Sequence, residues 1–206
     1  MSETTFKQKL ENFWYYYKFH TFVALFLAAV LVFGTVQFFT RKIPDYKVIM
    51  YLNEYESVRL ADAVESAFEK YAAELAGGAK KIVSVSNCSF REEKEHPGDV
   101  QFEKNQRTIL QGEIWEKKAF IFITDEYRYN ELENSSVLKG VLDEKNKKVP
   151  IKDTPFEKLI LDILPKDTVL PEMYLSMRKN PGTSDKTIDV VYNKSLELFN
   201  SITAKQ

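Results

Sequence analysis

The sequence has 206 residues, of which 44% are hydrophobic and 29% charged, as in a globular protein with one or two domains. Residues 1–44 contain five basic and two acidic side chains, a net charge of +3, which leaves 24 basic and 28 acidic side chains, a net charge of −4, in residues 45–206. Nucleic-acid binding depends on a basic surface that neutralises phosphates. Because residues 45–206 are mildly acidic, we do not expect a nucleic-acid partner.

The N-terminal tail, residues 1–20, contains apolar side chains at helical spacing: Phe6, Leu10, Phe13 and Tyr17. This spacing predicts an interfacial helix that leads into the next segment. A simple anchor is the favoured role for such a helix, and a calmodulin-like or lipid-sensing role is the alternative. The tail ends in FWYYYKFH, residues 13–20, in which five aromatic residues stand in a row.

Residues 21–40 contain no charged side chain and are long enough, at about 1.5 Å per residue, to cross the roughly 30 Å hydrocarbon core of a bilayer. Aromatic and basic residues at both ends are typical of the headgroup region. The sequence therefore predicts a transmembrane helix, and the expected interface anchors are Phe13, Trp14, Tyr15, Tyr16, Tyr17, Lys18, Arg41 and Lys42. No small-x-small cleavage site follows the span, which favours a retained signal anchor over a cleaved signal peptide.

The orientation of this helix is predicted from positive charge. Lys7, Lys9 and Lys18 lie in a short tail, where lysine favours retention in the cytoplasm. We expect a cytoplasmic N-terminus and an extracytoplasmic domain formed by residues 45–206, with the lipid bilayer as a partner.

The domain begins after Ile43-Pro44-Asp45 with alternating strand and helix patterns. The expected elements are a strand at 46–52, a helix at 57–76 that Gly77-Gly78 ends, a strand at 81–86, a loop at 91–100, a helix near 101–118 and a strand at 119–124. This order predicts an α/β fold with a mainly parallel sheet in the middle of three layers.

Further elements follow Asp125. The sequence predicts helices at 127–132 and 137–142, an exposed loop at 143–153, a strand at 173–177 and a helix at about 185–203. Thr154-Pro155-Phe156-Glu157 has the spacing of a capping box with proline at the first helical position, and the helix it starts should end before Pro165.

Polar residues follow the first three strands of the predicted sheet. In an open α/β sheet, ligands bind beyond the carboxyl ends of the strands. The predicted ligand crevice therefore contains Asn53, Glu54, Tyr55, Asn87, Ser89, Thr124, Asp125 and Tyr127. The same residue types are also common in turns and helix caps, so a purely structural role stays open.

Motifs for catalysis, cofactors and metals are not found in the sequence. It lacks a nucleophile elbow, an H-E-x-x-H motif and a phosphate-binding loop. His96 stands alone in a charged loop, and the single Cys88 fits a small buried residue at a strand end. We therefore expect no cofactor, no metal and no enzymatic activity.

Two stretches carry a resemblance to known proteins. AFIFITDEYRYNELENSSVLKGVLDE, residues 119–144, is similar to a segment of extracytoplasmic solute-binding proteins. The tail FWYYYKFHT, one span and the α/β pattern together resemble uncharacterised single-pass membrane proteins of Gram-positive bacteria. The first resemblance implies a fold like one lobe of a solute-binding protein.

The expected function is a membrane-anchored, non-catalytic extracytoplasmic binding domain. Its ligand would be a small polar solute or a partner membrane protein such as a transporter or receptor subunit. The alternative is a structural subunit of a membrane complex, and an exported hydrolase is the third hypothesis.

Overall fold

The computed structural model describes residues 6–40, 43–53, 58–89, 100–134, 141–143, 148–182 and 184–204. They belong to two compact units, one that ends at Ile43 and one that begins at Pro44.

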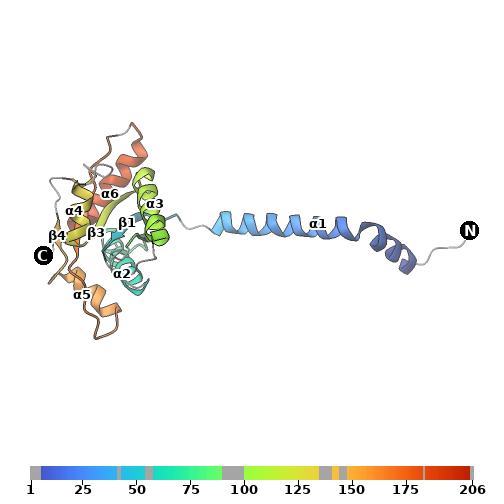
Figure 1. The fold of residues 1–206 in the computed structure, drawn as a ribbon, viewed down its shortest axis with the longest axis horizontal. Coiled ribbons are helices and arrows are strands. Elements are labelled where there is room, and N and C mark those ends of the chain that lie inside the picture. The colour runs from blue at the N-terminus through green and yellow to red at the C-terminus, as the bar shows by residue number, and fades with distance from the viewer. Residues whose placement is uncertain are drawn as a thin grey trace, which may run out of the picture. The chain divides into compact units, whose positions relative to one another are not determined.

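The first unit is a single long helix, α1 (Phe6–Thr40), drawn in blue in Figure 1. Its segment Phe13–Phe38 contains an 18-residue window with a mean hydropathy of 2.2 whose residues are not buried, so it is long and apolar enough to cross a membrane. A membrane anchor and a signal sequence share this property. The helix runs unbroken through the aromatic residues, so the predicted interfacial helix and the predicted span form one element, which begins before residue 21.

The second unit contains a five-stranded sheet with the strand order β2-β1-β3-β5-β4. Its strands are β1 (Tyr46–Tyr51), β2 (Val83–Asn87), β3 (Ala119–Thr124), β4 (Val149–Pro150) and β5 (Tyr174–Met177). β1 pairs in parallel with β2 and β3, whereas β5 is antiparallel to β3 and to β4. The sheet is therefore mixed, and the prediction of a mainly parallel sheet was wrong for its second half.

The direction of β5 follows from where the chain enters it. The backbone N–H of Ile151, directly after β4, donates to the carbonyl oxygen of Met173, directly before β5, over 2.9 Å. The chain therefore leaves β4 and enters β5 at the same edge of the sheet, and a strand that starts where its neighbour ended must run in the opposite direction.

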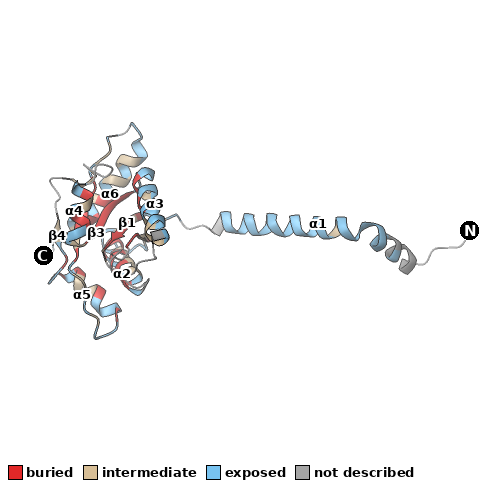
Figure 2. Ribbon diagram, viewed as in Figure 1, coloured by how far each residue is buried: buried red, intermediate tan, exposed pale blue. Residues whose placement is uncertain are grey.

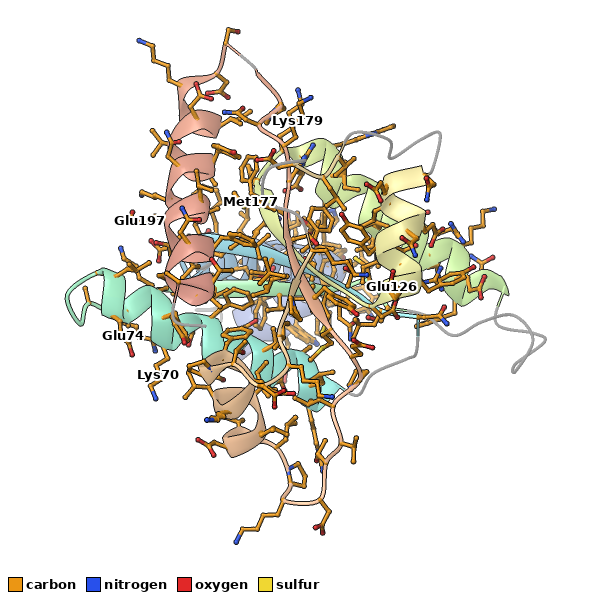
Figure 3. All side chains as sticks on the ribbon, turned by 90° about the vertical axis from the view of Figure 1, so that its left-hand side faces the viewer. Lys70, Glu74, Glu126, Met177, Lys179 and Glu197 are labelled. Atoms are coloured by element: carbon orange, nitrogen blue, oxygen red, sulfur yellow. The ribbon has the colours of Figure 1, made fainter. Side chains whose placement is uncertain are left out.

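Helices cover both faces of the sheet, which gives the predicted three layers. Residues of α2 (Val58–Leu75), α5 (Pro155–Ile163) and α6 (Lys186–Thr203) share one buried cluster with the strands. Residues of α3 (Val100–Glu116) and α4 (Glu126–Asn134) share the second. Figure 3 shows α6, carrying Glu197, on one side of the sheet and α4, carrying Glu126, on the other.

The core is built around β3, whose six residues are all buried, as the apolar run AFIFIT predicts. Figure 2 shows β1 and β3 in red at the centre of the unit. Phe68 of α2 and Phe156 of α5 pack edge to face with ring centroids 4.8 Å apart, which joins these helices above the sheet. Burial of each such side chain stabilises the fold by about 1.5–3 kcal/mol.

Two predicted helix ends are confirmed in detail. The hydroxyl of Thr154 accepts a hydrogen bond from the N–H of Glu157 over 3.1 Å, and the Glu157 carboxylate accepts from the N–H of Asp153 over 2.6 Å. At the end of α2, Gly77 and Gly78 take positive φ angles of 65° and 91°. The threonine cap and the glycine pair thus act as their spacing predicts, whereas Glu157 accepts from Asp153, one residue before the N-cap, because the N–H of Thr154 donates to the carbonyl oxygen of Ile151.

Several boundaries differ from the prediction. The expected loop 143–153 contains the short strand β4, because Val149 and Pro150 pair with β5. In the expected helix 137–142, residues 137–140 lie outside the described residues, and Leu142 forms an antiparallel bridge with Arg178 instead. The expected loop 91–100 also lies outside them, except for its last residue, which begins α3.

Candidate functional site

The carboxyl ends of β1, β2 and β3 meet at one edge of the sheet, because these strands are parallel and in register. β1 lies between the other two, and the connections through α2 and α3 cover opposite faces. The strand order thus reverses between β1 and β3, which is where open α/β sheets bind ligands.

Asp125 joins the ends of β1 and β3. One carboxylate oxygen accepts a short hydrogen bond from the backbone N–H of Asn53, and the other accepts from the N–H of Arg128 over 2.7 Å. The second bond satisfies a free N–H in the first turn of α4. Two of the predicted crevice residues, Asn53 and Asp125, are therefore in direct contact, and the carboxylate is occupied by the backbone.

Ser89 and Asn87 also serve the backbone at this edge. The Ser89 hydroxyl accepts from the N–H of Leu52 over 3.0 Å, and the Asn87 side-chain oxygen accepts from the N–H of Ser89 over 3.0 Å. Ser89 is buried, so these bonds fix how the chain leaves β1 and β2. This is the turn and cap chemistry that the sequence left open as the alternative role.

Two polar atoms at the same edge lack a hydrogen-bond partner within the described part of the chain. They are Oδ1 of Asn53 and Oγ1 of Thr124, and both atoms are buried. Thr124 directly precedes Asp125 in the chain. In the pairing of β1 with β3, Thr124 lies opposite Tyr51, which stands two residues before Asn53. Buried polar groups are nearly always hydrogen-bonded in proteins, so these two atoms are unusual, although Gln106, Ser176 and Arg178 also have buried polar atoms without a partner in the described part of the domain.

Of the other predicted crevice residues, Glu54 and Tyr55 lie outside the described residues. Tyr127 is 54% exposed and stands on α4, with the guanidinium carbon of Arg128 4.9 Å from its ring centroid. The structure thus brings Asn53, Thr124 and Asp125 together and places Tyr127 beside them on the following helix.

The sequence did not predict a charged cluster that joins β1, α3 and α4 and consists of Tyr51, Arg107, Arg128 and Glu131. The carboxylate of Glu131 accepts from the Tyr51 hydroxyl over 2.7 Å, from Arg128 over 2.6 Å and from Arg107 over 2.8 Å. The Arg128 guanidinium also lies 5.2 Å from the Tyr51 ring centroid. The spacing of Arg128 and Glu131, three residues apart on a helix, could have predicted their pairing.

The electrostatics of the cluster follow from burial and these bonds. Burial opposes ionisation of Glu131, but the hydrogen bonds from Tyr51, Arg128 and Arg107 outweigh it and hold the pKa of the carboxyl below its usual range. Burial, with the bond to Glu131, raises the pKa of the Tyr51 hydroxyl. Tyr51 has no exposed surface, so the pair fixes β1 against α4.

Cys88 lies between Asn87 and Ser89 and is fully buried. Burial, with a smaller contribution from the negative charge of Glu113, raises the pKa of its thiol to about 12. The thiol is therefore protonated and inert at neutral pH, since the thiolate is the reactive form. In the described ranges, no group of three or more His, Cys, Asp or Glu side chains is placed to hold a metal ion.

The interface anchors predicted on the N-terminal side stand on α1. Phe13, Trp14, Tyr15, Tyr16 and Tyr17 are all exposed, and so is Lys18. Arg41 and Lys42 lie outside the described residues. The rings of Phe13 and Tyr17 stack with centroids 5.3 Å apart, whereas those of Tyr15 and Tyr16 meet edge to face at 5.2 Å.

A shallow depression of about 180 Å³ lies farther along the same edge of the sheet, where β4 ends and β5 begins. Lys152 and Glu157 line it at the start of α5, and Glu172 lines it before β5. None of its lining residues belongs to the predicted crevice.

Comparison with protein-family models, with curated proteins and with solved structures gives no match to this chain.

Proposed function

We propose that this chain is a single-pass membrane protein whose domain from Pro44 on lies outside the cytoplasm and binds a small polar solute. The length and hydropathy of Phe13–Phe38 support α1 as a retained anchor. The lysines of the N-terminal tail, among them Lys7 and Lys9, favour a cytoplasmic tail.

The observation that carries the binding proposal is the pair of buried polar atoms at the point where the strand order reverses. Oδ1 of Asn53 and Oγ1 of Thr124 have no hydrogen-bond partner among the described residues. An amide oxygen accepts a hydrogen bond, and a hydroxyl both donates and accepts. Together they fit a small ligand that carries hydroxyl, amide or amino groups.

Binding without catalysis is part of the same proposal. A hydrolase needs two converging titratable groups with opposed pKa shifts that can reach a substrate. Tyr51 and Glu131 have opposed shifts, but these arise from burial and from hydrogen bonds within the cluster, including the bond that joins the two side chains. This pair therefore supports a structural role.

The test measures the melting temperature of the full chain in detergent micelles against a panel of sugars, amino acids, peptides and nucleotides. A ligand at 100 times its dissociation constant stabilises the folded state by about 2.7 kcal/mol, which raises the melting temperature by several degrees. The variant Thr124→Val removes the hydroxyl with little change in shape. It should abolish the shift while leaving the free protein at least as stable, because no bond is lost.

The matched control is Ser176→Ala. The Ser176 hydroxyl is also buried and has no partner in the described part of the chain, but it lies on β5. This variant should keep the ligand shift. A folded chain that no member of the panel stabilises would contradict the proposal and favour the alternative role as an interaction subunit of a membrane complex.

A further inference from the structure

The connection between the anchor and the domain is short. α1 ends at Thr40 and β1 begins at Tyr46, so five residues join them. Five residues reach at most about 18 Å when fully extended. A compact unit of roughly 160 residues has a radius of gyration of about 15 Å and is therefore about 40 Å across. An anchored α1 thus holds the beginning of β1 close to the lipid surface, an inference that rests on the membrane anchoring proposed above.

The beginnings of three strands lie together at this place. Tyr46 pairs with Val83 at the start of β2, and Lys47 pairs with Ala119 at the start of β3. The residues just before these strands therefore surround the point where the chain enters the domain. We call this surface the strand-start edge, and its members are Lys80, Lys81, Trp115, Lys117 and Lys118.

Trp115 is the most conspicuous member of the strand-start edge. It stands in the last turn of α3 and is 78% exposed. Its neighbour Glu116 accepts a hydrogen bond from Lys47 over 2.9 Å, which places this turn beside the start of β1. Exposed tryptophan is unfavourable in water, but its ring and N–H suit the boundary between acyl chains and headgroups.

Some lysines of the strand-start edge are paired with acids and others are not. Asp45 pairs with Lys81 over 3.6 Å, and both Glu113 and Glu116 pair with Lys47 over 3.0 and 2.9 Å. Lys80, Lys117 and Lys118 form no ion pair with any described residue. Three lysines beside an exposed tryptophan are complementary to a surface of anionic headgroups.

We propose that the strand-start edge is a membrane-docking surface that binds anionic phospholipid, with Trp115 in the headgroup region. The bilayer thus holds the domain twice, through α1 and through this edge. Docking fixes the orientation of the domain, and the carboxyl ends of β1 and β3, at the other end of these strands, face the solvent.

The chain contains two tryptophans, Trp14 and Trp115, so each can be observed alone. The full chain is reconstituted into bilayers that contain brominated phosphatidylcholine, with or without phosphatidylglycerol. In the Trp14→Phe variant we expect lipid quenching of Trp115 emission with phosphatidylglycerol and much weaker quenching without it. In the Trp115→Phe variant we expect quenching of Trp14 in both bilayers, which reports on insertion of α1.

The matched charge variants use three lysines each. Lys80→Gln, Lys117→Gln and Lys118→Gln together should remove the effect of phosphatidylglycerol. Each lysine near an anionic surface strengthens contact about fivefold, so the ratio of docked to undocked domain should fall about 100-fold. The control combines Lys152→Gln, Lys158→Gln and Lys166→Gln, exposed lysines on and beside α5, which covers the opposite face of the sheet from α3.

The two proposals fail in different ways. If Trp14 is quenched but Trp115 is not, or if both triple variants behave alike, the docking surface is refuted and the anchor stands. If neither tryptophan is quenched, the anchor itself is refuted.

Discussion

Glu131 offers the sharpest test of how α4 is held against the sheet. Its carboxylate accepts three hydrogen bonds, and the Arg128 side chain that provides one of them is only 3% exposed. Removing one partner of a buried ion pair costs about 3–5 kcal/mol when the other charge is left alone. In Glu131→Gln, one acceptor oxygen is kept and Arg128 still stacks on Tyr51, so we expect a loss of about 2–3 kcal/mol in the free energy of unfolding.

The assay is urea unfolding of the full chain in nonionic detergent, followed by circular dichroism. Glu133→Gln is the matched control, because Glu133 is an exposed residue of the same helix, and it should change stability by less than about 0.5 kcal/mol. Tyr51→Phe removes one buried bond to the carboxylate and should cost about 1.5 kcal/mol. If Glu131→Gln costs no more than Glu133→Gln, the cluster does not stabilise the fold and the reasoning is wrong.

The pH dependence of this loss has a definite sign. The pKa of Glu131 is lower in the folded protein than its ordinary value, because the bonds from Tyr51, Arg128 and Arg107 outweigh the effect of burial. The folded state therefore gains stability that is fully present above the unfolded pKa of about 4.3 and is lost as the pH falls through the folded pKa. The difference between the wild type and Glu131→Gln should be constant from pH 7 to about pH 5 and shrink below it.

Three further predictions concern single side chains. Ser89→Ala removes the acceptor of a buried backbone N–H and should cost about 1–3 kcal/mol, measured by the same unfolding assay, whereas a loss within error would mean that water replaces the hydroxyl. The Cys88 thiol, with its pKa of about 12, should not react with iodoacetamide at pH 8 in the folded chain and should react in 8 M urea; rapid labelling of the folded chain would contradict its burial. Thr154→Ala should cost about 1 kcal/mol by loss of the cap to Glu157, and an unchanged midpoint would show that the capping box is dispensable.

Features set by neighbouring residues could be predicted from the sequence. The apolar run of β3, the threonine cap at Thr154 and the glycine pair after α2 depend on contacts within a few residues, and the structure confirms each. The direction of β5 could not be predicted in this way. A buried four-residue strand has the same pattern in either direction, and its direction is fixed by the distant contact between Ile151 and Met173.

The candidate site divides in the same manner. Polar residues at strand ends were predicted, and Asn53, Thr124 and Asp125 indeed lie together. Some of these side chains bond to backbone N–H groups and others have atoms without a partner. Which side chain does which depends on the N–H groups nearby, and sequence spacing does not reveal these. The charged cluster was missed because Arg107 on α3 and Glu131 on α4, 24 residues apart in the sequence, meet only through the packing of the two helices.

The two outer strands of the sheet both resist pairing with another chain. β4 is only two residues long and ends in Pro150, which has no N–H to donate to an incoming strand. On the opposite edge, the N–H of Val85 in β2 is occupied by the carboxylate of Glu65 over 3.1 Å. Confinement to a bilayer raises the local concentration of a protein and favours edge-to-edge aggregation of exposed strands. With a two-residue strand on one edge and an occupied N–H on the other, this sheet offers fewer backbone groups to a neighbouring molecule at high surface density.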